Sequence, residues 1–148
     1  MNGTHEFDRT GREILLIEDN PDDAELTRIA FAEAGGDFPL RVLTDGAQAL
    51  AHLYACTPAK LPALILLDLN LPKLDGREVL QAIRAEPATR NLPVVMLTTS
   101  AEPFDVDDGY ALGANSYIQK PVEFERFVDV VRQIGLYWLE LNQPPAGG

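Results

Sequence analysis

The sequence has little cysteine and no long apolar run. One cysteine, Cys56, occurs among 148 residues, so an intramolecular disulfide is excluded. We expect its thiol to behave as a small, unreactive apolar group. No apolar stretch approaches the roughly 18 residues that a membrane span requires. The N-terminus also lacks the basic start and apolar segment of a signal peptide. These absences predict a cytoplasmic protein without a membrane partner.

Basic residues are also scarce. The chain carries 12 Lys and Arg against 23 Asp and Glu, a formal net charge of −11. A surface of this sign repels phosphate backbones, so we expect no nucleic-acid partner. The length suggests one domain. The polar or Pro/Gly-rich ends predict a flexible segment at 1–12 and a flexible tail at 142–148, with a single domain over 13–141.

Short apolar runs alternate with helical patterns along the chain. Asn20 and Asp75 have the residue types and positions of helix N-caps, and Glu78 completes a capping box with Asp75. Alternation with short connections predicts an α/β fold with a parallel sheet covered on both faces. We expect strands at Ile14–Ile17, Leu40–Leu43, Leu64–Leu67, Val94–Leu97 and Tyr117–Ile118. Helices are expected over 21–34, 46–54, 76–86, 105–112 and 123–141, and a loop at 58–62.

Polar side chains follow four of these strands directly. They are Glu18 and Asp19, Asp68, Thr98 and Lys120. The carboxyl ends of parallel strands meet at one edge of the sheet, where ligands bind. Three carboxylates there would repel each other, and Mg²⁺, with Mn²⁺ as a second candidate, suits such oxygen donors. A carboxylate flanked by a metal ion and an ammonium group can accept a phosphoryl group, and a threonine hydroxyl can donate to it.

Each of these residues also has an ordinary structural explanation. Asp19 could cap a helix, Asp68 could begin a turn before Pro72, Thr98 could be a strand threonine and Lys120 a solvated lysine. The four residue types at four strand ends favour a common site over four coincidences.

The stretches "ILLIEDNPDD", "ALILLDLNLPKLDG", "LPVVMLTTSAE" and "GANSYIQKP" resemble the receiver domain of two-component response regulators, from Ile14 to Leu141. The resemblance implies a doubly wound, flavodoxin-like sheet of five strands in the order 2-1-3-4-5. It implies that Asp68 accepts a phosphoryl group from a sensor histidine kinase, without turnover of an external substrate. The extended C-terminal end, with "EDNPDDAEL" and "LTTSAE", is similar to single-domain regulators that partner bacterial and cyanobacterial phytochrome kinases.

The same resemblance assigns roles to individual residues. Asp19, Asp68 and the Asn70 carbonyl would bind the metal ion, and Glu18 would assist through water. Thr98 and Lys120 would contact the phosphoryl group. Thr98 and Tyr117 would form the switch, with Tyr117 rotating inward after phosphorylation. The Lys120–Pro121 bond would be cis.

The C-terminal helix carries apolar residues on several sides, in "IGLYWLELN". We expect no output domain after the receiver, and therefore signalling by contact with an unknown downstream protein. We favour a homodimer through the fourth and fifth helices, with Tyr137, Trp138 and Leu139 in the interface. The alternative is that this end folds back on its own domain.

Two other functions compete with this interpretation. Haloacid-dehalogenase phosphatases also use a strand-end aspartate, but they carry a second aspartate two residues on, where this chain has Asn70. A phosphorylation-independent scaffold of receiver fold would usually have lost one of the site residues. Here the acidic pair Glu18 and Asp19, Asp68 and Lys120 are all present.

Overall fold

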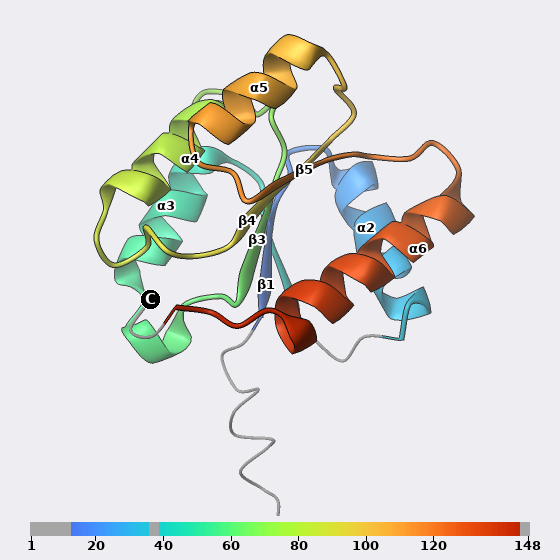
Figure 1. The fold of residues 1–148 in the computed structure, drawn as a ribbon, viewed down its shortest axis with the longest axis horizontal. Coiled ribbons are helices and arrows are strands. Elements are labelled where there is room, and N and C mark those ends of the chain that lie inside the picture. Colours follow the sequence, from blue (N-terminus) through green and yellow to red (C-terminus); the bar gives the residue numbers. More distant parts are fainter. Residues whose placement is uncertain (1–12, 36–38, 146–148) are drawn as a thin grey trace, which may run out of the picture.

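The five apolar runs form one parallel sheet in the computed structural model, which describes residues 13–35 and 39–145 (Figure 1). The strand order is β2-β1-β3-β4-β5, which confirms the doubly wound topology. β1 lies between β2 and β3, with Ile14 opposite Leu40 of β2 and Leu64 of β3. The strands are β1 (Ile14–Ile17), β2 (Leu40–Leu43), β3 (Leu64–Leu67), β4 (Val94–Thr98) and β5 (Ser116–Gln119).

Helices cover both faces of the sheet. α2 and α6 lie together on one face, and α3 and α4 lie together on the other, with α5 beside β5 (Figure 1). The expected loop at 58–62 contains a short 3₁₀ turn. The helical segments are α2 (Pro21–Glu33), α3 (Gly46–Ala55), η1 (Pro58–Lys60), α4 (Gly76–Ala85), α5 (Pro103–Ala111), α6 (Phe124–Gly135) and η2 (Leu136–Leu141).

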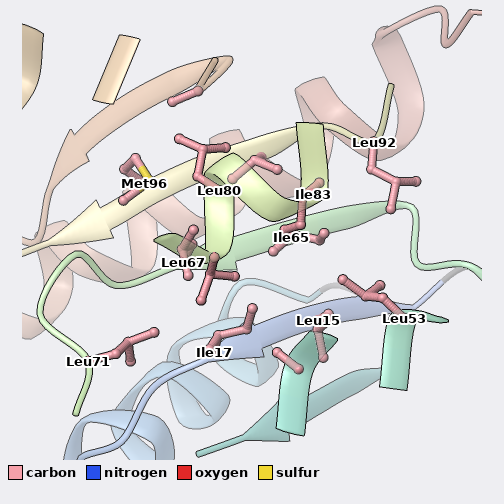
Figure 2. Close-up of a cluster of buried hydrophobic side chains, with 14 of the residues drawn as sticks. Leu15, Ile17, Leu53, Ile65, Leu67, Leu71, Leu80, Ile83, Leu92 and Met96 are labelled. Atoms are coloured by element: carbon pink, nitrogen blue, oxygen red, sulfur yellow. The ribbon is translucent and has the colours of Figure 1, made fainter. Parts of the chain in front are cut away.

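Two apolar layers sandwich the sheet because successive strand side chains point to opposite faces. Leu15 and Ile17 of β1 join the layer under α3 and α4, which Figure 2 shows with Leu53, Leu80 and other side chains. The neighbouring residues of β1 join the layer under α2 and α6. β1, β3 and β4 are buried throughout, so a polar residue directly after them lies at the rim of the core.

The predicted caps fix where two of the helices begin. The Asn20 side chain accepts hydrogen bonds from the backbone N–H groups of Asp22 and Asp23. Asp75 and Glu78 form the expected capping box at the start of α4. α2 therefore starts two residues after Asp19, and the start of α4 fixes the far end of the loop that follows Asp68.

The C-terminal helix differs from the prediction. α6 ends at Gly135, and η2 continues as a π-helical turn in which the Asn142 N–H donates to the Tyr137 carbonyl at 2.6 Å. Leu139 is buried in the layer under α2 and α6, and Trp138 packs against that layer. Trp138, Asn142, Pro144 and Pro145 line one hollow with residues of η1 and of the segments before β3 and β4. In this arrangement the C-terminal end of the chain packs on its own domain, which the sequence left as the alternative to an interface.

No helix in the described ranges, 13–35 and 39–145, is long and apolar enough to cross a membrane. The predicted flexible segment at 1–12 and the last three residues of the predicted tail lie outside the described residues.

Candidate functional site

Three carboxylates meet at the carboxyl edge of the sheet. Glu18 and Asp19 follow β1, Asp68 follows β3, and one oxygen of each lies within 4.8 Å of the others. Glu18 is buried, Asp68 is half-buried and Asp19 is exposed. The cluster therefore runs from the core to the surface and opens to solvent, as a site for a small charged ligand requires.

Lys120 joins this cluster from the other half of the sheet. Its Nζ donates to Glu18 Oε1 at 2.9 Å, and both side chains are nearly inaccessible, at 9% and 2% exposure. Glu18 also accepts the Asn20 N–H at 3.2 Å. Burial raises the pKa of Glu18, and Asp68 raises it further, whereas Lys120 opposes the rise. The sequence prediction placed Lys120 on the phosphoryl group but did not include this ion pair.

The loop after Asp68 turns sharply back onto the strand end. The Asn70 N–H donates to Asp68 Oδ1 at 3.3 Å, and the Gly76 N–H donates to the Leu69 carbonyl at 3.0 Å. A Cβ atom at Gly76 would overlap the Asp68 carbonyl oxygen. Glycine therefore allows α4 to begin directly against the residue that carries the central carboxylate.

Thr98 lies fully buried at the end of β4, opposite Gln119 of β5. Its carbonyl accepts the Lys120 N–H at 2.7 Å, which fixes the lysine backbone beside the threonine. The Ser100 N–H lies 3.5 Å from Thr98 Oγ1. Thr98 and Lys120 are therefore neighbours across two strands, as the sheet topology predicts.

Tyr117 lies half-buried on β5, against α5. Its hydroxyl donates to the Ser100 carbonyl at 3.0 Å, and a Cβ atom at Gly109 would lie 3.1 Å from its ring. Burial raises the pKa of Tyr117, and the hydrogen bond to Ser100 opposes the rise. The hydroxyl thus contacts the loop after β4, and the ring lies against α5.

The donor set fits a hard divalent cation. Carboxylate oxygens within 4.8 Å of one another, with one exposed member, match the oxygen ligation of Mg²⁺ or Mn²⁺, in which waters complete the shell. The Asn70 carbonyl belongs to the same loop as Asp68.

One backbone prediction was wrong. All peptide bonds among residues 13–35 and 39–145 are trans, including Lys120–Pro121. The trans form is the lower-energy isomer of most X–Pro bonds, and Lys120 reaches Glu18 in this geometry.

Of the three residues predicted for an interface, Tyr137 is exposed, Trp138 is half-buried and Leu139 is buried.

Sequence reasoning missed a polar network beside Thr98 and Tyr117, the two residues predicted to form a switch. Arg77 of α4 donates to Asp105 and Asp108 of α5, and Ser100 Oγ donates to Asp105 at 2.7 Å. The available signal was the acidic segment "FDVDDG", which carries no basic residue of its own. Such a helix requires a cation from a neighbouring element.

Comparison with known proteins agrees with this geometry. The family model described as the response regulator receiver domain matches residues 14–132. The chain is 42% identical over 134 residues to the probable methanogenesis regulatory protein FilR2 of Methanothrix harundinacea, covering 89% of this chain and 86% of that protein. It is 41% identical over 138 residues to the response regulator Rcp1 of a Synechocystis strain, covering 90% and 92%.

Solved structures of response regulators are also similar to this chain. The Mn²⁺-bound form of Rcp1 has a TM-score of 0.79 at 39% identity and covers 90% of this chain and 99% of that one. The phosphorylated cyanobacterial phytochrome response regulator RcpA has a TM-score of 0.82 at 37% identity and covers 90% and 98%. These matches favour neither the phosphatase nor the scaffold interpretation. The chain belongs to the receiver-domain family of two-component response regulators.

Proposed function

We propose that this response regulator accepts a phosphoryl group on Asp68 from a sensor histidine kinase. The observation that carries the proposal is the cluster of Glu18, Asp19 and Asp68, whose oxygens lie within 4.8 Å of one another beside the Lys120 ammonium group. Asp68 is its half-buried member, so it is held by the loop and still accessible. A carboxylate in such surroundings is a suitable nucleophile for phosphorus.

The metal ion of the site is Mg²⁺, with Mn²⁺ as a substitute. Asp19, Asp68 and the Asn70 carbonyl would hold it, and Glu18 would contribute through water. When bound, the ion neutralises charge on the transferring phosphoryl oxygens. The fit of the carboxylate cluster and the Mn²⁺-bound form of Rcp1 support this assignment.

The remaining site residues respond to the charge that phosphorylation adds. A phosphoryl group brings about two negative charges and strong acceptor oxygens. Lys120 binds these oxygens, and the Thr98 hydroxyl turns to donate to one of them. Tyr117 is then held inward, where its ring already lies against Gly109 of α5 and its hydroxyl already donates to the Ser100 carbonyl. The protein has no enzymatic activity beyond Mg²⁺-dependent phosphorylation and dephosphorylation of its own aspartate.

The kinase partner is a phytochrome-type sensor. RcpA is described as a phytochrome response regulator, which supports this choice, whereas FilR2, of similar identity, is described as a regulator of methanogenesis. Helix α2 would dock the kinase, with the exposed side chains of Leu26 and Ile29. Phosphotransfer from a panel of histidine kinases tests the choice, and preferential transfer from a kinase without a phytochrome module would contradict it.

Output passes to a cytoplasmic protein partner through the surface of α5, β5 and α6, where a homodimer also forms. Tyr137 remains the best interface candidate, because Leu139 is taken up by the core. Molar mass by light scattering, with and without beryllofluoride, tests the dimer. A monomer under both conditions at high concentration would exclude it.

The proposal is tested by incubating the protein with acetyl phosphate and Mg²⁺ and measuring intact mass. The parent should gain one phosphoryl group, and Asp68→Asn should gain none. Asp75→Asn is the matched control, since Asp75 lies in the same loop and asparagine also caps helices. Equal labelling of the parent and Asp68→Asn would refute the proposal.

A further inference from the structure

A single guanidinium group ties α5 to α4. Arg77, in the first turn of α4, donates from Nε to Asp108 Oδ2 at 2.7 Å and from Nη2 to Asp105 Oδ1. The three side chains are 28%, 34% and 21% exposed, in the order Arg77, Asp108, Asp105. Charge-assisted bonds that are shielded to this degree are stronger than fully exposed ion pairs.

Asp105 connects this ion pair to the switch residues. Its second oxygen, Oδ2, accepts the Ser100 hydroxyl at 2.7 Å. Ser100 in turn accepts the Tyr117 hydroxyl on its carbonyl, and its N–H lies 3.5 Å from Thr98 Oγ1. Arg77 therefore holds, through Asp105, the part of the loop after β4 to which the Tyr117 hydroxyl is bonded.

Besides these bonds, the Tyr110 hydroxyl of α5 accepts the Tyr117 N–H of β5 at 3.2 Å, but α5 buries little apolar surface. The helix has nine residues, its buried member is Gly109, and its N-cap residue Glu102 makes no side-chain capping bond. Phe104 and Tyr110 are exposed rather than packed in the core. With so little buried apolar surface, the position of α5 depends strongly on its polar contacts.

Removing the guanidinium would leave acidic groups facing one another. Arg77 Nη1 also lies 3.7 Å from Asp75 Oδ2, so Asp75 at the N-terminus of α4 and the two aspartates of α5 share one cation. Without it, like charges across the contact would repel. Loss of Arg77 should therefore displace α5, rather than leave it loosely in place.

We propose that Arg77 is a positioning residue that holds α5 and Ser100 in the arrangement in which Tyr117 lies inward, and so sets how readily phosphorylation of Asp68 stabilises that arrangement. The inference rests on the proposed function. A ligand that binds one arrangement only has an apparent dissociation constant equal to its intrinsic value divided by the fraction of molecules in that arrangement. Weakening the arrangement with Tyr117 inward must therefore weaken the apparent binding of a phosphoryl analogue.

The test is a titration of the full chain with beryllofluoride in Mg²⁺, followed by the amide resonance of Gly109 on α5. In Arg77→Ala, the unliganded resonance should lie farther from the saturated position than that of the parent, on the line through the free and saturated parent positions. Half-saturation should need about three- to tenfold more beryllofluoride than the parent needs. Arg77→Lys should be intermediate, because an ammonium group lacks the fork that spans two carboxylates.

Arg132→Ala is the matched control. It removes a guanidinium that donates to Asp129 on α6, away from α5, and should leave the titration unchanged. An Arg77→Ala titration identical to the parent would overturn the inference, as would a Gly109 shift off the parent line. A parent that binds no beryllofluoride at all would instead contradict the proposed function.

Discussion

Lys120 Nζ lies 2.9 Å from Glu18 Oε1, which joins the end of β5 to the end of β1 across 102 positions of sequence. β5 and β1 are not neighbours in the sheet, so this pair ties together its two halves at the site edge. Both groups are nearly inaccessible to solvent, at 9% and 2% exposure. The ion pair thus has a structural role in addition to the proposed contact of Lys120 with phosphate.

Lys120→Met should lower the free energy of unfolding by about 2–3 kcal/mol, because it leaves the Glu18 carboxylate buried without its cation. Urea unfolding of the parent and the variant measures the change. The double variant Lys120→Met, Glu18→Gln should recover part of the loss, since no charge then remains buried. A single variant as stable as the parent would show that the pair contributes nothing.

Gly76→Ala should unfold at lower urea concentration and bind Mg²⁺ more weakly, because the added Cβ overlaps the Asp68 carbonyl oxygen. Overpacking of this kind typically costs about 1–3 kcal/mol. Gly135→Ala is the matched control: Gly135 is helical, a Cβ added there would have nothing within 4 Å, and alanine should stabilise by about 0.5–1 kcal/mol. Equal effects of the two substitutions would contradict the close approach at Gly76.

Magnesium should stabilise the folded protein, because it relieves repulsion among Glu18, Asp19 and Asp68. At about ten times its dissociation constant, a ligand bound only by the folded state adds about 1.4 kcal/mol. Asp19→Asn should lose most of this gain. Thermal unfolding with MgCl₂ is compared with NaCl at matched ionic strength, and an equal effect of the two salts would exclude a specific site.

Tyr117 should make the protein less stable at alkaline pH. Its pKa is raised by burial above the usual value of about 10, so the folded state keeps the phenol proton after the unfolded state has lost it. Stability should therefore fall as the pH rises from about 10 toward the higher pKa of the folded state. Tyr117→Phe should show a smaller decrease over this range in urea unfolding. A decrease of the same size in the parent and in Tyr117→Phe would show that groups other than Tyr117 cause the loss of stability.

The sequence predicted the sheet, its order and the meeting of four polar strand ends, because buried strands and capped helices leave local patterns. Asn20 and Asp75 cap as predicted for this reason. The position of Leu139 in the core could not be predicted, because it depends on a π-helical turn whose backbone geometry has no clear residue signature. The Arg77 contacts were missed because they join two helices, 28 and 31 positions apart, and no local pattern or sheet-edge rule shows which side chains of two neighbouring helices will meet.

The central claim is that the phosphoryl group is attached to Asp68, and chemical mapping tests it most directly. Borohydride reduces an aspartyl phosphate to homoserine, and peptide mass spectrometry then locates that residue. After treatment with acetyl phosphate and Mg²⁺, homoserine should appear at position 68 and at no other acidic residue. Homoserine at Asp19, Asp75 or elsewhere, with Asp68 unchanged, would contradict the account.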